Sequence, residues 1–250
     1  MRPVELVELG SGSSRKTRLL LEAMRRQGNG GRCYAPLDVS EDALEGAAKV
    51  LTADYPWLEF DGFVGDFTAD LPRVPRRGRR LLAFLGSTVG NLEPVERAAL
   101  LRGVAASLRP GDRFLLGVDL VKDRATLLAA YDDAAGVTAE FNRNMLHVLN
   151  AALDARIPVE AFEHVARYDE ALARMEMWLR ARRPVTMRFP TLGLEVPFEA
   201  GEALRTEISC KFTRPVVERE LTAAGLALES WYQDAQHRFA LALASRISPG

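Results

Sequence analysis

The chain has 250 residues, of which 48% are hydrophobic and 27% are charged, and its formal net charge at pH 7 is −1. This composition is typical of a folded protein with room for one large α/β domain, alone or with a small lobe. The near-neutral charge gives no overall attraction to nucleic acid or to an anionic membrane, so we expect neither as a partner. No signal-peptide pattern or membrane-length apolar run occurs, which predicts a cytoplasmic protein. Cys33 and Cys210 lie in apolar contexts without partner spacing, and we expect buried free thiols.

The first predicted element is a buried strand over 4–9, followed by a glycine turn at Gly10 and Gly12. Apolar residues at helical spacing then predict a helix over 16–26. A strand, a glycine turn and a helix start form the nucleotide-binding corner of open α/β sheets. We therefore expect a nucleotide-like ligand at this turn.

Three ligand classes use such a turn, and the residue at position 15 separates them. Residues 10–17 almost fit the P-loop pattern, but Arg15 stands where the second glycine is needed, and the dinucleotide pattern fails for the same reason. The remaining class is S-adenosylmethionine (SAM), which has no pyrophosphate and whose ammonium suits an acid such as Glu8 on the first strand. An ordinary strand-to-helix turn remains the alternative if the motif is taken alone.

Acidic residues follow the next two predicted strands, 33–38 and 58–64. Asp38 ends the first of them, where a carboxylate can accept hydrogen bonds from ribose hydroxyls. Asp66 and Phe67 follow the second, where a carboxylate and an aromatic ring suit the amine and ring of adenine. Both acids have an alternative interpretation as helix caps. The five arginines between 73 and 80 predict a solvated loop.

An apolar run over 81–85 predicts a central parallel strand, and Gly86 to Asn91 follow its carboxyl end, where such sheets hold substrates. The Asn91 amide and nearby carbonyls are therefore candidates for contacting a polar substrate, with a simple turn residue as the alternative for Asn91. A helix over 95–108 and a strand over 113–118 complete this part.

The second half of the chain is expected to be less regular. We predict helices over 125–131, 141–153 and 215–225, with His147 packing rather than binding a metal. Alternation predicts antiparallel strands over 173–180 and 185–189, a turn into a short helix over 199–204, a strand over 205–210 and a final strand over 231–244. Glu207 and Ser209 would share one face of their strand, where a carboxylate and a hydroxyl can hold a heteroaromatic ring with N–H donors, such as imidazole. Taken alone, the pair has a solvent-facing position as its alternative.

These segments together resemble the histidine-specific SAM methyltransferases, enzymes that methylate the α-amino group of L-histidine three times to hercynine, the first step of ergothioneine biosynthesis. The resemblance covers nearly the whole chain. It rests on motifs in order: Glu8-Leu-Gly-Ser-Gly-Ser-Ser-Arg-Lys-Thr17, Gly65-Asp-Phe67, Phe84-Leu-Gly-Ser-Thr-Val-Gly-Asn-Leu92, Asp119-Leu-Val-Lys-Asp123, Ala130-Tyr-Asp-Asp133, Phe141-Asn-Arg-Asn144, Met175-Glu-Met-Trp-Leu179 and Thr206-Glu-Ile-Ser-Cys-Lys-Phe212.

The resemblance implies an α/β fold: a Rossmann-like class I SAM methyltransferase core over 1–135, completed by 213–250, with a smaller α+β substrate lobe over 136–212. It implies SAM as methyl donor, L-histidine as substrate, no metal and a monomeric enzyme. The residues that it assigns to SAM are Gly10, Lys16, Asp38, Asp66 and Phe67. The residues that it assigns to catalysis and substrate are Gly86, whose carbonyl lies near the amine, Asn91 and Tyr131 at the carboxylate and amine, and Met177, Glu207 and Ser209 at the imidazole. The roles of Lys16, Tyr131 and Met177 come from the resemblance only.

One departure from the family pattern concerns the start of the chain. Family members carry a largely helical segment before the first strand, which contributes a lid and an imidazole-binding tyrosine, and we expect this chain to lack it. Two alternatives to histidine methylation therefore stay open: an N-methyltransferase for another amino acid or an indole derivative, and an inactive, shortened paralogue.

Overall fold

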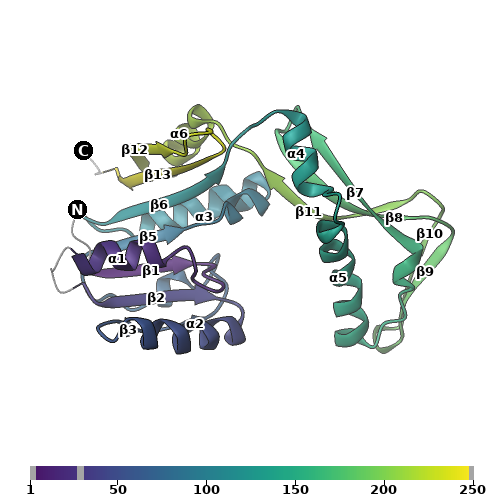
Figure 1. Ribbon diagram of the computed structural model, residues 1–250, viewed down its shortest axis with the longest axis horizontal. Coiled ribbons are helices and arrows are strands. Elements are labelled where there is room, and N and C mark those ends of the chain that lie inside the picture. The colour runs from purple at the N-terminus through teal and green to yellow at the C-terminus, as the bar shows by residue number, and fades with distance from the viewer. Residues whose placement is uncertain (1–3, 27–30, 248–250) are drawn as a thin grey trace. The chain divides into compact units, whose positions relative to one another are not determined.

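The computed structural model describes residues 4–26 and 31–247 of the chain. It divides into two compact units (Figure 1). The core unit comprises Met1–Leu120 and Phe212–Gly250, and the lobe comprises Val121–Lys211. The boundary differs from the predicted one at 135 and 136, because helix α4 (Arg124–Tyr131) packs on strands of the lobe.

The core unit is built on an eight-stranded sheet with the order β12-β13-β6-β5-β1-β2-β3, and β4 pairs with β2. All five residues of β1 are buried, as expected for a strand in the middle of a parallel sheet. The parallel strands β1, β2, β5 and β6 have their carboxyl ends at one edge, where ligands bind in such sheets. Their bounds are β1 Glu5–Leu9, β2 Cys33–Asp38, β3 Glu59–Phe60, β4 Phe63–Val64, β5 Arg80–Phe84 and β6 Arg113–Asp119.

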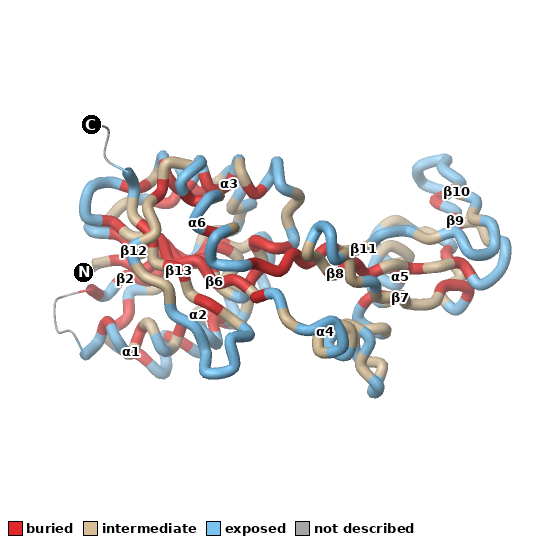
Figure 2. Tube along the Cα trace, turned by 90° about the horizontal axis from the view of Figure 1, so that it is seen from above, coloured by how far each residue is buried: buried red, intermediate tan, exposed pale blue. Residues whose placement is uncertain are grey.

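Helices cover both faces of this sheet. In Figure 2, α1 and α2 lie on one face, and α3 and α6 on the other. The bounds of these helices are α1 Arg18–Arg26, α2 Glu41–Asp54, α3 Pro94–Ser107 and α6 Arg214–Ala223. The core unit therefore has the three layers of a doubly wound α/β fold, as predicted.

The end of the chain forms a hairpin, where the sequence predicted one strand over 231–244. Strands β12 (Leu226–Gln233) and β13 (Phe239–Arg246) pair antiparallel, and β13 also runs antiparallel to β6. The turn between them contains neither glycine nor proline, and His237 takes the left-handed φ of +53° instead. Asp234 accepts hydrogen bonds from the N–H groups of Arg238 and Phe239, which stabilises the turn. The usual sequence signal of a hairpin is therefore missing.

The lobe combines antiparallel strands with two helices. Its three-stranded sheet has the order β11-β8-β7, and β9 pairs with β10. Strand β11 already begins at Ala203, so the short helix predicted over 199–204 is wrong, and β7 and β10 were not predicted. The bounds are α4 Arg124–Tyr131, α5 Val137–Leu153, β7 Phe162–Asp169, β8 Arg174–Ala181, β9 Val185–Phe189, β10 Leu194–Phe198 and β11 Ala203–Cys210.

The sequence predicted a solvated loop for the arginines between 73 and 80, and this is wrong for Arg76 and Arg80. Arg80 is 2% exposed, and its Nε donates a 2.9 Å hydrogen bond to Oε1 of the fully buried Glu5. Arg76 pairs with buried Asp112 at 2.7 Å. Arg79, in contrast, is exposed. The segment thus anchors the amino end of the central strands.

The cysteine prediction is confirmed: Cys33 and Cys210 are free and buried, and burial raises the pKa of Cys33 to about 11. Among residues 4–26 and 31–247, no helix combines the length and the apolar character needed to cross a membrane.

Candidate functional site

The glycine turn after β1 adopts backbone conformations that favour glycine. Gly10 has a φ of +60° and Gly12 a φ of +49°. A Cβ on Gly10 would lie 3.6 Å from ring atoms of both Phe67 and Phe84. The turn is therefore left-handed and closely packed at Gly10.

Glu8 is a buried anchor below this turn. Its Oε2 accepts hydrogen bonds from Thr17 Oγ1 and, at 2.5 Å, from Tyr34 Oη. Burial raises the pKa of Glu8, while the hydrogen bonds from Thr17 and Tyr34 oppose the shift. Glu8 thereby fixes the start of α1 against β1 and β2.

Asp38, at the end of β2, holds the glycine turn directly. Its Oδ2 accepts from the backbone N–H of Gly12 at 2.7 Å, and its Oδ1 accepts from that of Ser40 at 3.0 Å. The N-cap of α2 is Ser40, whose hydroxyl accepts from the N–H of Ala43. The alternative of Asp38 as a helix cap is therefore wrong, and its carboxylate lies beside the glycine turn.

Asp66 and Phe67 occupy a turn that follows β4. The exposed Asp66 accepts from the backbone N–H and the hydroxyl of Thr68 through Oδ1, at 2.8 and 2.7 Å. The Phe67 ring packs against Phe84 with 5.0 Å between centroids. The Phe67 ring thus lies beside Gly10, and Asp66 precedes it in the chain.

Gly86 and Lys16 lie next to each other in the lining of a cavity of about 620 Å³ in the core unit. Gly86 has a φ of +78°, and a Cβ there would lie 2.8 Å from Lys16 Nζ. The buried Ser11 Oγ has no hydrogen-bond partner, which leaves one polar atom of the wall available to a ligand. The lining residues are Glu8, Gly10, Ser11, Gly12, Ser13, Arg15, Lys16, Leu85, Gly86 and Thr88. A polar cavity of this volume at a glycine turn has room for SAM. Of the residues assigned to SAM, Gly10 and Lys16 line it, whereas Asp38, Asp66 and Phe67 do not.

Asn91 is exposed at the end of the 3₁₀ helix Thr88–Asn91, which follows β5. Just before this helix, Ser87 has a left-handed φ of +65°. The Ser87 hydroxyl accepts from the backbone N–H of Asp119 at 2.8 Å, which ties the ends of β5 and β6 together. The segment that carries Gly86 and Asn91 is thereby fixed at the carboxyl edge of the sheet.

In the lobe, three polar side chains form a closed triangle. Lys211 Nζ donates to Tyr131 Oη and to Ser209 Oγ, and Tyr131 Oη donates to Ser209 Oγ, each at 2.8 Å. The Lys211 ammonium also lies 4.7 Å from the centroid of the Tyr131 ring. Ser209 and Lys211 are buried, so the triangle is a preorganised polar cluster.

Glu207 lies on the same face of β11 as Ser209, as the alternation predicted. Opposite it on β8 stands the buried Met177, so the two side chains share one face of the sheet. Burial raises the pKa of Glu207, and the positive charge of Lys211 partly opposes this shift. The lobe thus brings together Tyr131, Met177, Glu207 and Ser209, whereas Gly10, Lys16, Asp38, Phe67 and Gly86 gather in the core unit.

Sequence reasoning missed the residues that position Tyr131. Asn142, 3% exposed, donates through Nδ2 to His164 Nδ1 at 2.9 Å and accepts from Thr206 at 2.6 Å. His164 Nε2 lies 2.8 Å from the carbonyl of Tyr131. Because the Asn142 amide donates to Nδ1, the His164 proton is on Nε2 and is donated to that carbonyl. His147, in contrast, is exposed on α5, so the prediction that it packs is wrong.

Two signals in the sequence point to these missed residues. Asn142 is a polar residue four positions before the apolar Leu146 on the buried face of α5, and Lys211 stands between Cys210 and Phe212 at the end of a strand. A polar side chain in such a position needs a buried partner.

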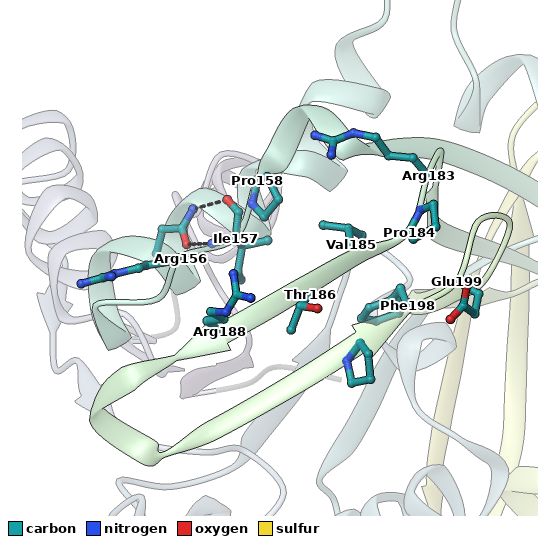
Figure 3. A pocket seen from close by; sticks show the side chains of 12 residues that line it. Arg156, Ile157, Pro158, Arg183, Pro184, Val185, Thr186, Arg188, Phe198 and Glu199 are labelled. Carbon is teal, nitrogen blue, oxygen red and sulfur yellow. Dashed lines mark hydrogen bonds between the residues drawn. The ribbon is translucent and has the colours of Figure 1, made fainter.

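A second hollow, of about 750 Å³, is in the lobe and lies beside the β9–β10 hairpin (Figure 3). The end of α5 closes one side, where Asn150 exchanges two hydrogen bonds with the backbone of Ile157. Arg156, Thr186 and Arg188 line it, and none of the predicted site residues does. The hollow is therefore separate from the Tyr131–Ser209–Lys211 triangle.

Comparisons with known proteins show the family and the fold of this chain. A family model for histidine-specific, SAM-dependent methyltransferases matches residues 1–246. The chain is 50% identical over 241 residues to Histidine N-alpha-methyltransferase of Mycobacterium tuberculosis, covering 96% of this chain and 75% of that protein. It is 29% identical over 251 residues to Ergothioneine biosynthesis protein 1 of Neurospora crassa, covering 97% of this chain and 28% of that protein.

Among solved structures, the glycopeptide N-methyltransferase MtfA, in complex with SAM, aligns with a TM-score of 0.51. The alignment covers 98% of this chain and 82% of that one at 18% identity, and it shows the class I methyltransferase fold. The chain is thus an enzyme that uses SAM as methyl donor, and it belongs to the family of histidine-specific methyltransferases.

Proposed function

We propose that this enzyme methylates the α-amino group of L-histidine three times, giving hercynine, and that it serves ergothioneine biosynthesis. The observation that carries the proposal is the pairing of Glu207 and Ser209 on one face of β11. A carboxylate accepts from a ring N–H and a hydroxyl can serve the other ring nitrogen, which matches imidazole. The names of the mycobacterial and fungal relatives support both the substrate and the pathway.

The core unit is proposed to hold the methyl donor. Asp38 would accept from the ribose hydroxyls, Asp66 and Phe67 would hold adenine, and Gly10 would allow close approach of the backbone. Lys16 would contact the carboxylate of the methionine end. SAM supplies a methyl group already activated on a sulfonium, so the protein needs chiefly to align the reactants and exclude water.

The histidine amine must be neutral to attack. The Gly86 carbonyl would accept a hydrogen bond from it, and Asn91 and Tyr131 would hold the amine and the carboxylate. Burial of the amine lowers its pKa by desolvation, so these residues orient the lone pair without acting as a strong base. Met177 would pack on the imidazole face.

Incubation with L-histidine and SAM, followed by mass spectrometry, tests the proposal. We expect a product carrying three added methyl groups on the α-nitrogen. Methylation of tryptophan or another amine with histidine left unmodified would support the alternative substrate class, and no product with any amine would support an inactive paralogue. A monomeric, cytoplasmic enzyme is also part of the proposal, and light scattering after size exclusion tests its oligomeric state.

A further inference from the structure

Lys211 is buried at 4% exposure, and the proposed function gives it no role. Its backbone N–H is already bonded to the carbonyl of Ala173 at 2.7 Å, so the main chain is anchored there independently of the side chain. The ammonium group instead contacts Ser209 and Tyr131, two residues proposed to touch histidine. Burying an ammonium is costly, which points to a use for its charge or its hydrogens.

The hydrogen atoms of the triangle can be accounted for one by one. An ammonium donates and cannot accept, so Lys211 is the donor to both hydroxyl oxygens. The Tyr131 hydroxyl donates to Ser209, so Ser209 Oγ accepts two hydrogen bonds, one from Tyr131 and one from Lys211. A hydroxyl has two acceptor lone pairs and one hydrogen. With both lone pairs of Ser209 occupied, its remaining capacity is to donate.

The face of β11 therefore presents two groups of opposite polarity. Glu207 accepts and Ser209 donates, two residues apart on one side of the strand. A neutral imidazole has one N–H and one bare nitrogen, and it satisfies both groups. An imidazolium has two N–H groups, so its second N–H would face the Ser209 hydrogen.

On the basis of the proposed function, we propose that Lys211 is a positioning residue that fixes Ser209 as a hydrogen-bond donor, so that the site selects the neutral imidazole of histidine. Lys211 need not touch the substrate. When the Lys211 ammonium is removed, the Ser209 hydroxyl can turn its hydrogen toward Tyr131. Ser209 then no longer donates a hydrogen bond to the imidazole ring.

A pair of ring analogues tests the polarity of Ser209 directly. The 4-thiazolyl and 5-thiazolyl alanines place one bare nitrogen at either position of the histidine ring nitrogens, and thienylalanine has the same ring shape without a nitrogen. We would measure their dissociation constants by calorimetry with S-adenosylhomocysteine present. The wild type is expected to bind one thiazole about tenfold more tightly than thiophene, the effect of one hydrogen bond.

The Lys211→Met variant removes the ammonium, and its thiazole-to-thiophene ratio is expected to fall to about one. Lys211→Arg, which keeps a cationic donor, is expected to restore most of the preference. Ser209→Ala should abolish it, and adding Lys211→Met to Ser209→Ala should change the ratio no further. If Lys211→Met does not fold, Lys211→Gln is used in its place. The glutamine amide oxygen can accept the Ser209 hydrogen, so the thiazole-to-thiophene ratio is expected to fall in this variant as well.

Two outcomes would overturn the role of Lys211. One is a wild type without thiazole preference. The other is an unchanged ratio in the folded Lys211 variant, which includes an equal weakening of both ligands. Histidine methylation by the wild type is measured alongside. If histidine is trimethylated while the ratio is unchanged, only the inference on Lys211 fails, whereas an enzyme that neither binds nor methylates histidine overturns the proposed function together with it.

Discussion

The Asp38 carboxylate accepts a 2.7 Å hydrogen bond from the backbone N–H of Gly12, which joins the end of β2 to the glycine turn after β1. One side chain thus organises the turn, and we propose that it also binds the ribose of SAM. These two roles of Asp38 can be separated by mutation. An amide oxygen can still accept the hydrogen bond from Gly12, but an amide lacks the negative charge of the carboxylate.

Replacement of Asp38 should therefore weaken binding of the methyl donor, and Asp38→Ala should weaken it more than Asp38→Asn. Asp38→Ala removes both interactions, and we expect a loss of roughly tenfold to a hundredfold, since hydrogen bonds to charged groups contribute about 1.5–3 kcal/mol. Asp38→Asn should lose less, because its Oδ1 can still accept from Gly12. Calorimetry with S-adenosylhomocysteine measures both variants, and equal affinity in the wild type and Asp38→Ala would refute the role.

Replacement of Gly86 by alanine should destabilise the protein. At a φ of +78°, an L-residue is strained by about 1–2 kcal/mol, and the new Cβ would displace Lys16 Nζ, 2.8 Å away. The matched control is Gly103→Ala in the middle of α3, where a Cβ meets nothing within 4 Å. This control should stabilise by about 0.5–1 kcal/mol. Thermal unfolding that shifts both variants in the same direction would contradict the argument.

The raised pKa of Glu207 predicts that Glu207→Gln stabilises the ligand-free protein at neutral pH. Burial makes the folded state hold this proton more tightly than the unfolded chain, so folding becomes less favourable as pH rises from the unfolded pKa through the raised folded pKa. The gain in melting temperature should disappear below about pH 4, where the carboxyl is protonated in both states. Histidine affinity should fall in the same variant, and a lower melting temperature at pH 7 would count against the account.

The buried pair of Glu5 and Arg80 should matter far more to stability than an exposed pair. Glu5→Ala leaves the Arg80 guanidinium, 2% exposed, without its carboxylate, and we expect a loss of about 3–5 kcal/mol. The control is Glu195→Ala, which breaks the exposed pair with Arg188 and should cost at most about 1 kcal/mol. Denaturant unfolding compares the two, and similar losses would disprove the distinction.

Asn142→Ala should destabilise the lobe and disturb Tyr131. It leaves His164 and Thr206 without their shared partner, at a cost of about 1–3 kcal/mol. Because His164 also donates to the Tyr131 carbonyl, the apparent affinity for histidine should fall with it. Thr52→Ala, an exposed hydroxyl on α2, is a control that should change neither quantity. Unchanged histidine affinity in Asn142→Ala would show that the hydrogen bonds of Asn142 with His164 and Thr206 do not support substrate binding.

The parts of the fold that local sequence determines were predictable. The glycine turn, the acids at strand ends and the alternation that carries Glu207 and Ser209 each depend on residues within a few positions of one another. Pairing over long distances is different. Arg79 and Arg80 are neighbours of one type, yet only Arg80 is buried, because Glu5 lies beside it on the adjacent strand. Asn142 likewise meets His164 and Thr206 only through tertiary structure, as Lys211 meets Tyr131, so their roles were missed.

The lobe is entered and left at one place. Leu120 and Phe212 form an isolated bridge within the core unit, and the Phe212 N–H donates to the carbonyl of Asp119 at 2.8 Å. All of Val121–Lys211 is therefore an insertion whose two ends lie side by side, so a change in its length or sequence need not alter the path of the chain through the central sheet.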